Sequence, residues 1–345
     1  MEGSYKDGKK VGQWVLIFNN QEKGGGCYND EGLKNGCWTE LHEKYNEQCQ
    51  ISIKGQYING IKSNSWIITY QDKHLGGGDY EESQKTGHWI EVYENFNDRC
   101  QIILEGEYIK GQKSGQWITK LRESSVEQFQ LIIGQGNYKD GLKIGEWIDI
   151  DLNYELTNQI TYCGEYQNGR KLGFWQIKQN QVVIGGGVYL LGAIKDGQWV
   201  ELDDNFSDLC QIFYSGQYKN GIKNGDWEIK MRSKNNLNDI IFQGGGKYLQ
   251  GVQIGIWREL SQNSWNDCQI IYEGSYENGK KYGKWDTYVQ QDSSIQKKTL
   301  EGGGQYNIKG LKDGPWIDLS ESIWNPQQSL IVQKFQSGLS LKNSS

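Results

Sequence analysis

The sequence predicts an all-β protein, a repeat array of antiparallel β-hairpins that forms an elongated, twisted sheet or open solenoid. The prediction rests on one motif, Gly-x-Tyr-x-x-Gly-x-Lys-x-Gly-x-Trp, which recurs twelve times along the 345 residues. It also rests on composition, because 46 glycines and only 2 prolines suit many tight turns between hydrogen-bonded strands. Aromatic residues make up 12% of the chain, so burial must depend on rings more than on aliphatic side chains.

The charge and the cysteines restrict the classes of function. A net charge of −6 gives no electrostatic footprint for nucleic acid and none for an anionic membrane. The sequence shows no signal-peptide pattern and no apolar run long enough to span a membrane. Seven cysteines, an odd number with free spacing, fit a reducing compartment, so we expect a cytoplasmic protein.

Each motif supplies one tyrosine and one tryptophan, which we expect to stack as a structural aromatic ladder. Between the two rings lie Asn-Gly or Asp-Gly steps such as Asn59-Gly60, which supply the positive φ of a tight hairpin turn. The glycine two residues before each tyrosine leaves room for a neighbouring ring to lie across the sheet. The predicted ladder consists of Tyr5, Trp14, Tyr28, Trp38, Tyr57, Trp66, Tyr80, Trp89, Tyr108, Trp117, Tyr138, Trp147, Tyr166, Trp175, Tyr189, Trp199, Tyr218, Trp227, Tyr248, Trp257, Tyr276, Trp285, Tyr306 and Trp316.

The tryptophan spacing groups the twelve motifs into six pairs. The interval from the Trp of an even-numbered motif to the next Trp is always 28 residues, as from Trp38 to Trp66, whereas the alternate intervals range from 23 to 31. We therefore expect one fixed and one adjustable connection per pair, with the adjustable ones projecting from a common edge and determining partner choice. Residues 1–345 are predicted to form a single repeat domain, in which 317–345 make a degenerate C-terminal capping half-repeat.

The two ends of the array leave three arrangements open. Only Met1 to Ser4 precede the first tyrosine, whereas the C-terminus carries a leading strand with Phe335 at the tyrosine position and no hairpin after it. This tail caps the last motif, pairs with another chain to give a homo-oligomer, or closes on its own head as a six-unit propeller-like ring. We favour the open array because the period of the motif is a hairpin and not a four-stranded blade.

The Gly-x-Tyr-x-x-Gly-x-x-x-Gly frame resembles the MORN repeat, an antiparallel hairpin unit that stacks into elongated sheets, and the match runs from Gly3 to Trp316. The ending Gly225-Asp226-Trp227 departs from MORN repeats, which usually carry a further glycine there, and looks closer to the repeats of the YwqK-type antitoxin group. The resemblance implies scaffolding, cytoskeletal or membrane-adjacent roles and homodimerisation, with no shared chemistry.

Two other recurrent features have structural interpretations. Glycine triplets lack the Gly-Lys-Ser/Thr of a phosphate loop and precede a strand tyrosine, so we interpret them as sites of close backbone approach or of a bulge. The triplets are Gly24 to Gly26, Gly76 to Gly78, Gly185 to Gly187, Gly244 to Gly246 and Gly302 to Gly304. One repeat position holds a cysteine four times, too far apart for a disulfide or a shared metal, so we expect small buried core residues at Cys49, Cys100, Cys210 and Cys268.

No set of residues indicates catalysis, a cofactor or a metal site. The three histidines His42, His74 and His88 sit at unrelated repeat positions. Acids such as Glu201 and Asp203 follow the even-numbered tryptophans, and we interpret them as a solvated edge rather than as a catalytic pair. We therefore expect neither an enzyme nor a bound cofactor.

A lysine follows the hairpin turn in eleven of the twelve motifs, with Gln253 in its place in the tenth. Such a row could touch acidic lipid or protein. We favour the alternative in which each alkyl stem covers a neighbouring Trp ring. The lysines are Lys10, Lys34, Lys62, Lys85, Lys113, Lys143, Lys171, Lys195, Lys223, Lys281 and Lys312.

Three functions stay open on these observations. The one we favour is a non-catalytic structural or scaffold protein of the cytoplasm, associated with the cytoskeleton if the MORN resemblance holds, that binds protein partners through an extended aromatic β-sheet surface. The second is an antitoxin-like inhibitor that binds one specific protein. The third is a peripheral membrane-associated adaptor that uses the lysine row. None of the three involves nucleic acid.

Overall fold

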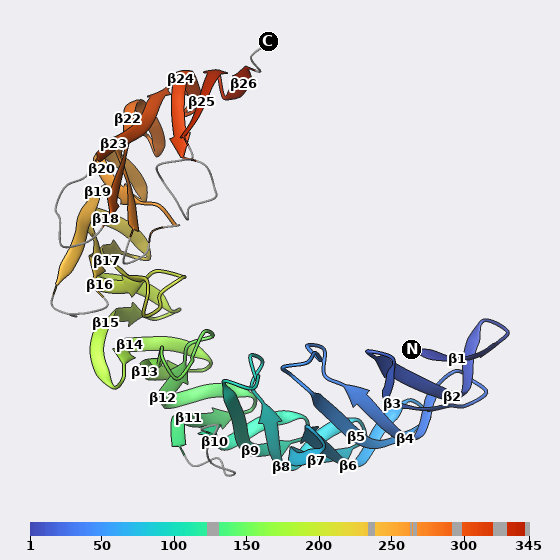
Figure 1. Ribbon diagram of the computed structural model, residues 1–345. Helices are drawn as coiled ribbons and strands as arrows, with labels where there is room; N and C mark the ends of the chain where they lie inside the picture. The colour runs from blue at the N-terminus through green and yellow to red at the C-terminus, as the bar shows by residue number, and fades with distance from the viewer. Residues whose placement is uncertain are drawn as a thin grey trace. The chain divides into compact units, whose positions relative to one another are not determined.

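The computed structural model describes residues 1–122, 131–233, 239–262, 264, 268–291, 299–319 and 330–341. These residues form strands and turns, with no helix among them. All strands belong to one antiparallel sheet, which is open, because the pairings described join β1 (Glu2–Lys6) only to β2 and β26 (Leu339–Leu341) only to β25 (Figure 1). The predicted all-β array of hairpins is confirmed, and the closed ring is excluded.

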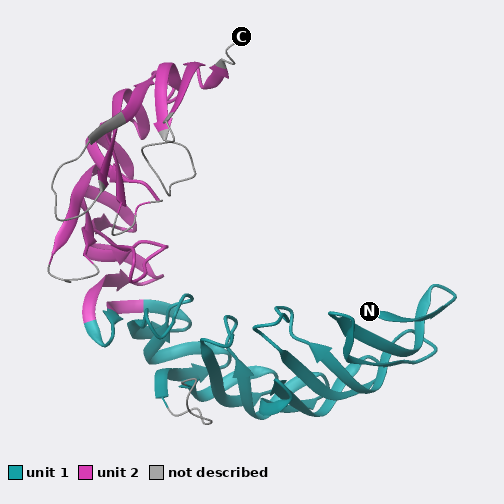
Figure 2. Ribbon diagram, in the orientation of Figure 1, with its two compact units in different colours: residues 1–171, 178–182 teal, residues 172–177, 183–345 magenta. Residues whose placement is uncertain are grey.

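The chain divides into two compact units (Figure 2). Unit 1 comprises residues 1–171 and 178–182. Its strands pair antiparallel with the next strand along the chain from β1 to β13. After β1 they are β2 (Lys9–Phe18), β3 (Gln21–Tyr28), β4 (Lys34–Leu41), β5 (Ile51–Ile58), β6 (Ile61–Tyr70), β7 (Lys73–Glu81), β8 (Gln84–Val92), β9 (Gln101–Ile109), β10 (Gln112–Arg122), β11 (Leu131–Lys139), β12 (Leu142–Ile150), β13 (Ile160–Gln167) and β14 (Arg170–Gln179), which has residues in both units.

Unit 2 comprises residues 172–177 and 183–345 and repeats the same meander. Its strands pair in chain order from β15 to β26. Before β26 they are β15 (Val182–Leu190), β16 (Ile194–Leu202), β17 (Gln211–Lys219), β18 (Ile222–Arg232), β19 (Ile240–Leu249), β20 (Val252–Leu260), β21 (Cys268–Glu277), β22 (Lys280–Gln291), β23 (Thr299–Tyr306), β24 (Lys312–Leu319) and β25 (Leu330–Gln336).

The hairpin turns form as predicted and are tied to one another. Asn59 and Gly60 have φ values of 48° and 84°, the two positive angles that a two-residue hairpin turn requires. The N–H of Gly60 donates to the Lys34 carbonyl at 2.7 Å, and that of Gly111 donates to the Lys85 carbonyl at 2.9 Å. Each of these turns is thus hydrogen-bonded to the turn of the preceding motif, and together they form what we call the turn edge of the sheet.

The glycine before each tyrosine is the place where a tryptophan packs. A Cβ atom on Gly55 would lie 2.2 Å from the Trp66 ring, and one on Gly106 would lie 2.4 Å from the Trp117 ring. The predicted gap is therefore filled by the indole of the same motif. In the triplets, the middle glycine Gly77 has φ 126° and approaches the Trp66 carbonyl so closely that a Cβ would lie 1.9 Å from its oxygen. Close backbone approach is therefore confirmed, and the ladder register shifts beside it.

The C-terminal strands differ from the prediction. Phe335 pairs with Gly314 in the register in which Tyr276 pairs with Gly255, so it occupies the tyrosine position as expected. The chain then turns at Gly338 and β26 forms three ladder pairs with β25. The expectation that no hairpin follows this strand is therefore wrong. Residues 320–329 and 342–345 of the predicted half-repeat lie outside the described residues.

A methyl group at Gly106 should destabilise the array. In Gly106→Ala the new Cβ would lie 2.4 Å from atoms of the Trp117 ring. Overpacking of this kind lowers the free energy of unfolding by about 1–3 kcal/mol. Gly115→Asn is the control, because Asn64 already holds the equivalent position in the third motif with φ 59°. Urea unfolding followed by tryptophan fluorescence measures both variants. An Asn variant that loses as much stability as the Ala variant would contradict the steric argument.

Candidate functional site

The aromatic ladder is the interior of each unit. In unit 1 the rings from Tyr5 to Tyr166 alternate in edge-to-face contact, with centroids 5.0–6.2 Å apart. In unit 2 such contacts run from Trp175 to Trp316 at 4.8–6.3 Å. The twelve tryptophans are only 1–7% exposed. The tryptophans of the ladder are therefore core residues, whereas its first ring, Tyr5, is 63% exposed.

The turn lysines cover the tryptophans. The Nζ atom of Lys62 lies 4.0 Å from the Trp66 ring centroid, and that of Lys113 lies 3.7 Å from the Trp117 centroid. Between Lys113 and Trp117 the ladder with β9 is interrupted, and Gly115 takes φ 65°. This break allows the lysine to fold over the indole of its own motif. The lysines thus cover the rings as predicted, with the ammonium group in cation–π contact.

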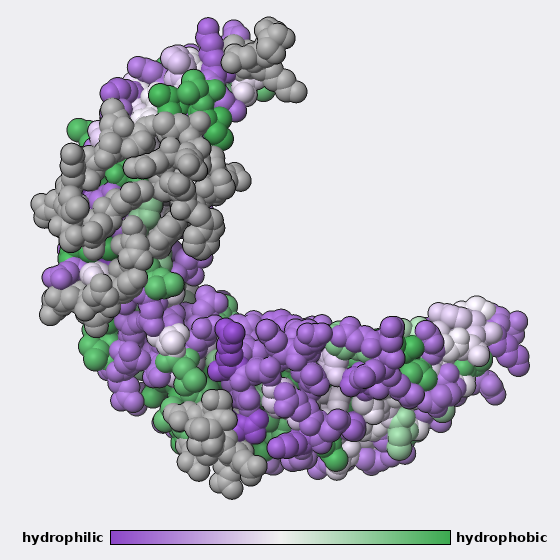
Figure 3. All heavy atoms as spheres, in the orientation of Figure 1, coloured by the Kyte–Doolittle hydropathy of each residue, from purple (hydrophilic) through white to green (hydrophobic). Residues whose placement is uncertain are grey.

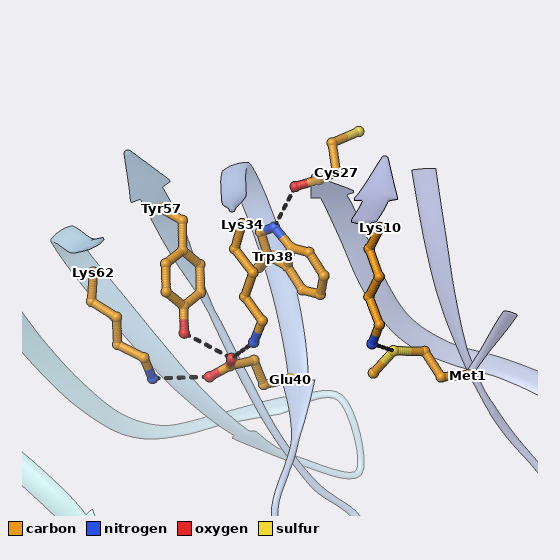
Figure 4. A network of polar contacts seen from close by, with 8 residues as sticks. All are labelled: Met1, Lys10, Cys27, Lys34, Trp38, Glu40, Tyr57 and Lys62. Atoms are coloured by element: carbon orange, nitrogen blue, oxygen red, sulfur yellow. Dashed lines mark hydrogen bonds and ion pairs between the residues drawn. The ribbon is translucent and has the colours of Figure 1, made fainter. Parts of the chain in front are cut away.

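The acids that follow the even-numbered tryptophans bind these lysines. Glu40 accepts a hydrogen bond from the Tyr57 hydroxyl at 2.8 Å, forms an ion pair with Lys62 at 2.9 Å, and forms a second ion pair with Lys34 (Figure 4). Its side chain is 21% exposed. Our interpretation of these acids as a solvated edge is wrong at Glu40, Glu91 and Glu201, because lysines from two successive motifs reach each of these carboxylates.

This charge pattern has the same period as the pairs of motifs. An acid stands two residues after every even-numbered tryptophan, at Glu40, Glu91, Asp149, Glu201, Glu259 and Asp318. The equivalent residues after the odd-numbered tryptophans are Leu16, Ile68, Thr119, Ile177, Ile229 and Thr287. We call the turn lysines and these six acids the lysine–carboxylate row. The alternation was visible in the sequence and could have identified the row.

The row sets the ionisation of its members. Burial raises the pKa of Glu91, but Lys113 and Lys85 outweigh burial and hold that pKa below its ordinary value. Burial and the charge of Glu91 raise the pKa of Tyr108, whose hydroxyl donates to this carboxylate at 2.9 Å. Burial also lowers the pKa of Lys113 against the attraction of Glu91. Of these three groups only Glu91 titrates at acidic pH. The stability of the row in acid therefore depends on the ion pairs of Glu91.

The fixed connections stack on one another at the opposite edge of the sheet, which we call the loop edge. In unit 1 they are residues 42–50, 93–101 and 151–159. The Asp98 N–H donates to the Gln48 carbonyl at 3.2 Å, which joins the first loop to the second. The Tyr93 hydroxyl donates to the Asp151 carbonyl at 3.1 Å, which joins the second loop to the third. A loop of another length would break this stack, which explains the constant interval of 28 residues.

Short adjustable connections end at the same edge. Asn19 and Asn20, Gln71 and Asp72, and Asn180 and Gln181 are two-residue turns with positive φ at both positions. They lean on the fixed loops, as shown by the hydrogen bond from the Gln71 N–H to the Gln50 carbonyl at 3.1 Å. The longer adjustable connections include 123–130, 234–238 and 292–298, which lie outside the described residues.

A groove of about 350 Å³ crosses the three stacked loops of unit 1. Its floor contains Phe96 and Tyr154, both only 3% exposed, together with the buried cysteines of two loops. Its walls are polar and include Gln48, Asn153 and Glu155. Hydrophilic residues also cover most of the face of unit 1 that is visible in Figure 3. The groove thus has a mixed lining, with amide and charged side chains beside Leu152, Phe96 and Tyr154.

The cysteines that recur at one repeat position are core residues. Cys49, Cys100, Cys210 and Cys268 are 3–9% exposed, so the prediction of buried core residues is confirmed. The Cys100 thiol donates to the Tyr154 carbonyl at 3.0 Å, across two loops.

Within the described part of the chain no group of three or more His, Cys, Asp and Glu side chains could hold a metal ion. Nor do these residues include a helix able to cross a membrane.

The comparisons with known proteins add no family. No family model matches the sequence, and the search of curated proteins gives no match either.

Acid should weaken the lysine–carboxylate row. Because the pKa of Glu91 is lowered in the folded chain, its contribution is present above the ordinary value of 4.5 and is lost as the pH falls through the lowered one. Glu91→Gln should cost about 1–3 kcal/mol at pH 7, and this cost should shrink below pH 4.5. Urea unfolding at a series of pH values measures it, with Glu146→Gln, an exposed acid on β12, as the control. A cost that does not change with pH would contradict the assignment.

The cysteines should differ in reactivity. Burial, with a smaller effect of Glu155, raises the pKa of the Cys100 thiol to about 11. Cys27 and Cys37 are exposed. Iodoacetamide at pH 8 should therefore alkylate Cys27 and Cys37 well before Cys100, as followed by peptide mass spectrometry. In urea all three should react at similar rates. Rapid labelling of Cys100 in the native chain would show that the loop stack opens easily.

Proposed function

We propose that this chain is a non-catalytic scaffold that binds protein partners through its loop edge. The observation that supports this is the stacking of the loops 42–50, 93–101 and 151–159 into one surface with a groove across it. Hydrogen bonds between the loops hold this surface, so it does not depend on a partner for its order. A preformed polar surface of this kind suits recognition of another protein.

The other parts of the molecule are occupied by the fold itself. The tryptophans of the ladder are buried, and the ammonium groups of the row lie over indoles or on carboxylates. These contacts leave the row less suited to a lipid surface than a free line of lysines. The carboxylates of Glu40 and Glu91 already contact lysines and a tyrosine. Such contacts recur along the array, which is typical of structural residues rather than of a catalytic centre.

The repeat type and the compartment complete the proposal. The motif frame from Gly3 to Trp316 supports a MORN-like variant. All seven cysteines are free thiols, which supports a reducing compartment such as the cytoplasm. An inhibitor of one specific protein, the alternative function, would use the same edge, and the experiment below would then recover a single partner.

Partner capture should depend on the loop edge. Leu152, on the third loop, is 61% exposed, and Ile58, beside the opposite turn edge, is 48% exposed. Leu152→Arg adds bulk and charge beside the groove, whereas Ile58→Arg makes the same change away from it. Quantitative mass spectrometry after affinity capture from a native lysate should show partners lost by Leu152→Arg and kept by Ile58→Arg. Equal recovery with both variants and the unmodified chain would contradict the proposal.

A further inference from the structure

We propose that the groove on the loop edge of unit 1 binds an extended, basic segment of a protein partner. This inference rests on the proposed scaffold function and names the class of partner at that surface.

The groove presents side chains that the loop stack does not use. Asn46 and Asn97 each bond to their own loop through both side-chain atoms, and Asn95 donates to the Leu152 carbonyl. In contrast, the side chains of Gln48 and Asn153 make no hydrogen bond within the described residues. An amide side chain both donates and accepts, so it can bond the N–H and C=O groups of an extended chain. These two amides come from the first and third loops, so the groove offers backbone-binding groups along its length.

The charge of the stacked loops favours a basic occupant. Residues 42–50, 93–101 and 151–159 contain six acids, Glu43, Glu47, Glu94, Asp98, Asp151 and Glu155, and only two cations, Lys44 and Arg99. The ammonium group of Lys44 is held by the Glu94 carbonyl at 2.9 Å and by Asn95 Oδ1 at 3.1 Å. Lys44 also lines the groove, but it forms no ion pair with Glu155 within the described residues, so the Glu155 carboxylate is open to a partner. Lysine or arginine side chains in the partner would complement this surface.

The closed floor argues for an extended segment and against an apolar anchor. Phe96 and Tyr154 are buried beneath the groove, and Cys100 bonds to the Tyr154 carbonyl between them. A helix that binds by inserting apolar side chains needs a largely apolar groove, whereas seven of the twelve residues that line this groove carry a charge or an amide. An extended chain needs only backbone partners and charge, and the walls supply both.

Fluorescence anisotropy on the full chain tests the inference. The probe is a fluorescein-labelled peptide of alternating serine and lysine, about twelve residues long, and its counterpart alternates serine and glutamate. At low salt the lysine peptide should bind and the glutamate peptide should not, and added salt should weaken binding. Glu155→Gln should weaken binding about tenfold because it removes a charged hydrogen-bond partner. Gln48→Ala should weaken it by a smaller factor, and Glu146→Gln, the exposed acid on β12, should change it less than about twofold.

Several results would overturn the proposal. The first is that both peptides bind alike, and the second is that the lysine peptide does not bind at millimolar concentration. The third is that Glu155→Gln and Glu146→Gln weaken binding equally, which would mean that the peptide is attracted only by the net charge. Circular dichroism spectra of the variants identify a change of fold. If captured partners depend on Leu152 while the lysine peptide does not bind, the class of partner is wrong and the scaffold function stands. If capture is insensitive to Leu152, the scaffold function itself fails.

Discussion

The array depends on the contact between each tryptophan and the glycine of its own motif on the adjacent strand. The indole occupies the space that a Cβ atom would take at Gly55 or Gly106, so the ring lies flat across two strands and touches a tyrosine on each side. Each edge-to-face pair adds about 0.5–1.5 kcal/mol beyond burial, and the pairs continue from motif to motif. A chain with only 36% hydrophobic residues thereby obtains a continuous core.

The lysine–carboxylate row exists because this core needs a cover. Lysines folded over the indoles shield them from water and gain cation–π attraction, but burying ammonium groups together is costly. Glu91 offsets that cost, since it lies between Lys85 and Lys113 and also accepts a hydrogen bond from Tyr108. At Glu40, Glu91 and Glu201 one acid serves two lysines, so one acid is enough for two motifs. The structural unit is therefore a pair of motifs, in charge as well as in length.

Local rules explain what the sequence could predict. The turn at Asn59 and Gly60 and the gap at Gly55 follow from conformational limits within a few residues, and both are present. The partners of Glu40 were not predictable in this way, because Tyr57 and Lys62 lie 17 and 22 residues further along the chain. The alternating pattern assigned each residue to a face. It did not show that the broken ladder brings a lysine back over its own tryptophan.

The loop stack was missed for a related reason. Cys100 and the carbonyl of Tyr154 are 54 residues apart, and their contact exists only because successive fixed connections have equal length. The cysteine position alone indicated burial, which is confirmed, but not the loop above it. The C-terminal hairpin was missed because β26 is only three residues long and lacks the aromatic signal that identified the other strands.

The two kinds of connection at the loop edge differ in length variation because they differ in packing. A fixed loop must place its cysteine against the next loop, as Cys100 does against Tyr154, and its aromatic residue against an earlier strand, as Phe96 does against Tyr70 of β6. Its length therefore cannot vary without loss of packing. An adjustable connection only has to join two strands, which a turn such as Asn19-Asn20 achieves with two residues. Extra residues there cost little, because loop-closure entropy grows slowly with length. The loop edge therefore combines a constant, hydrogen-bonded surface with segments free to differ in length and sequence. That combination distinguishes this edge from the turn edge, where most of the described two-residue turns donate a hydrogen bond to the turn before them.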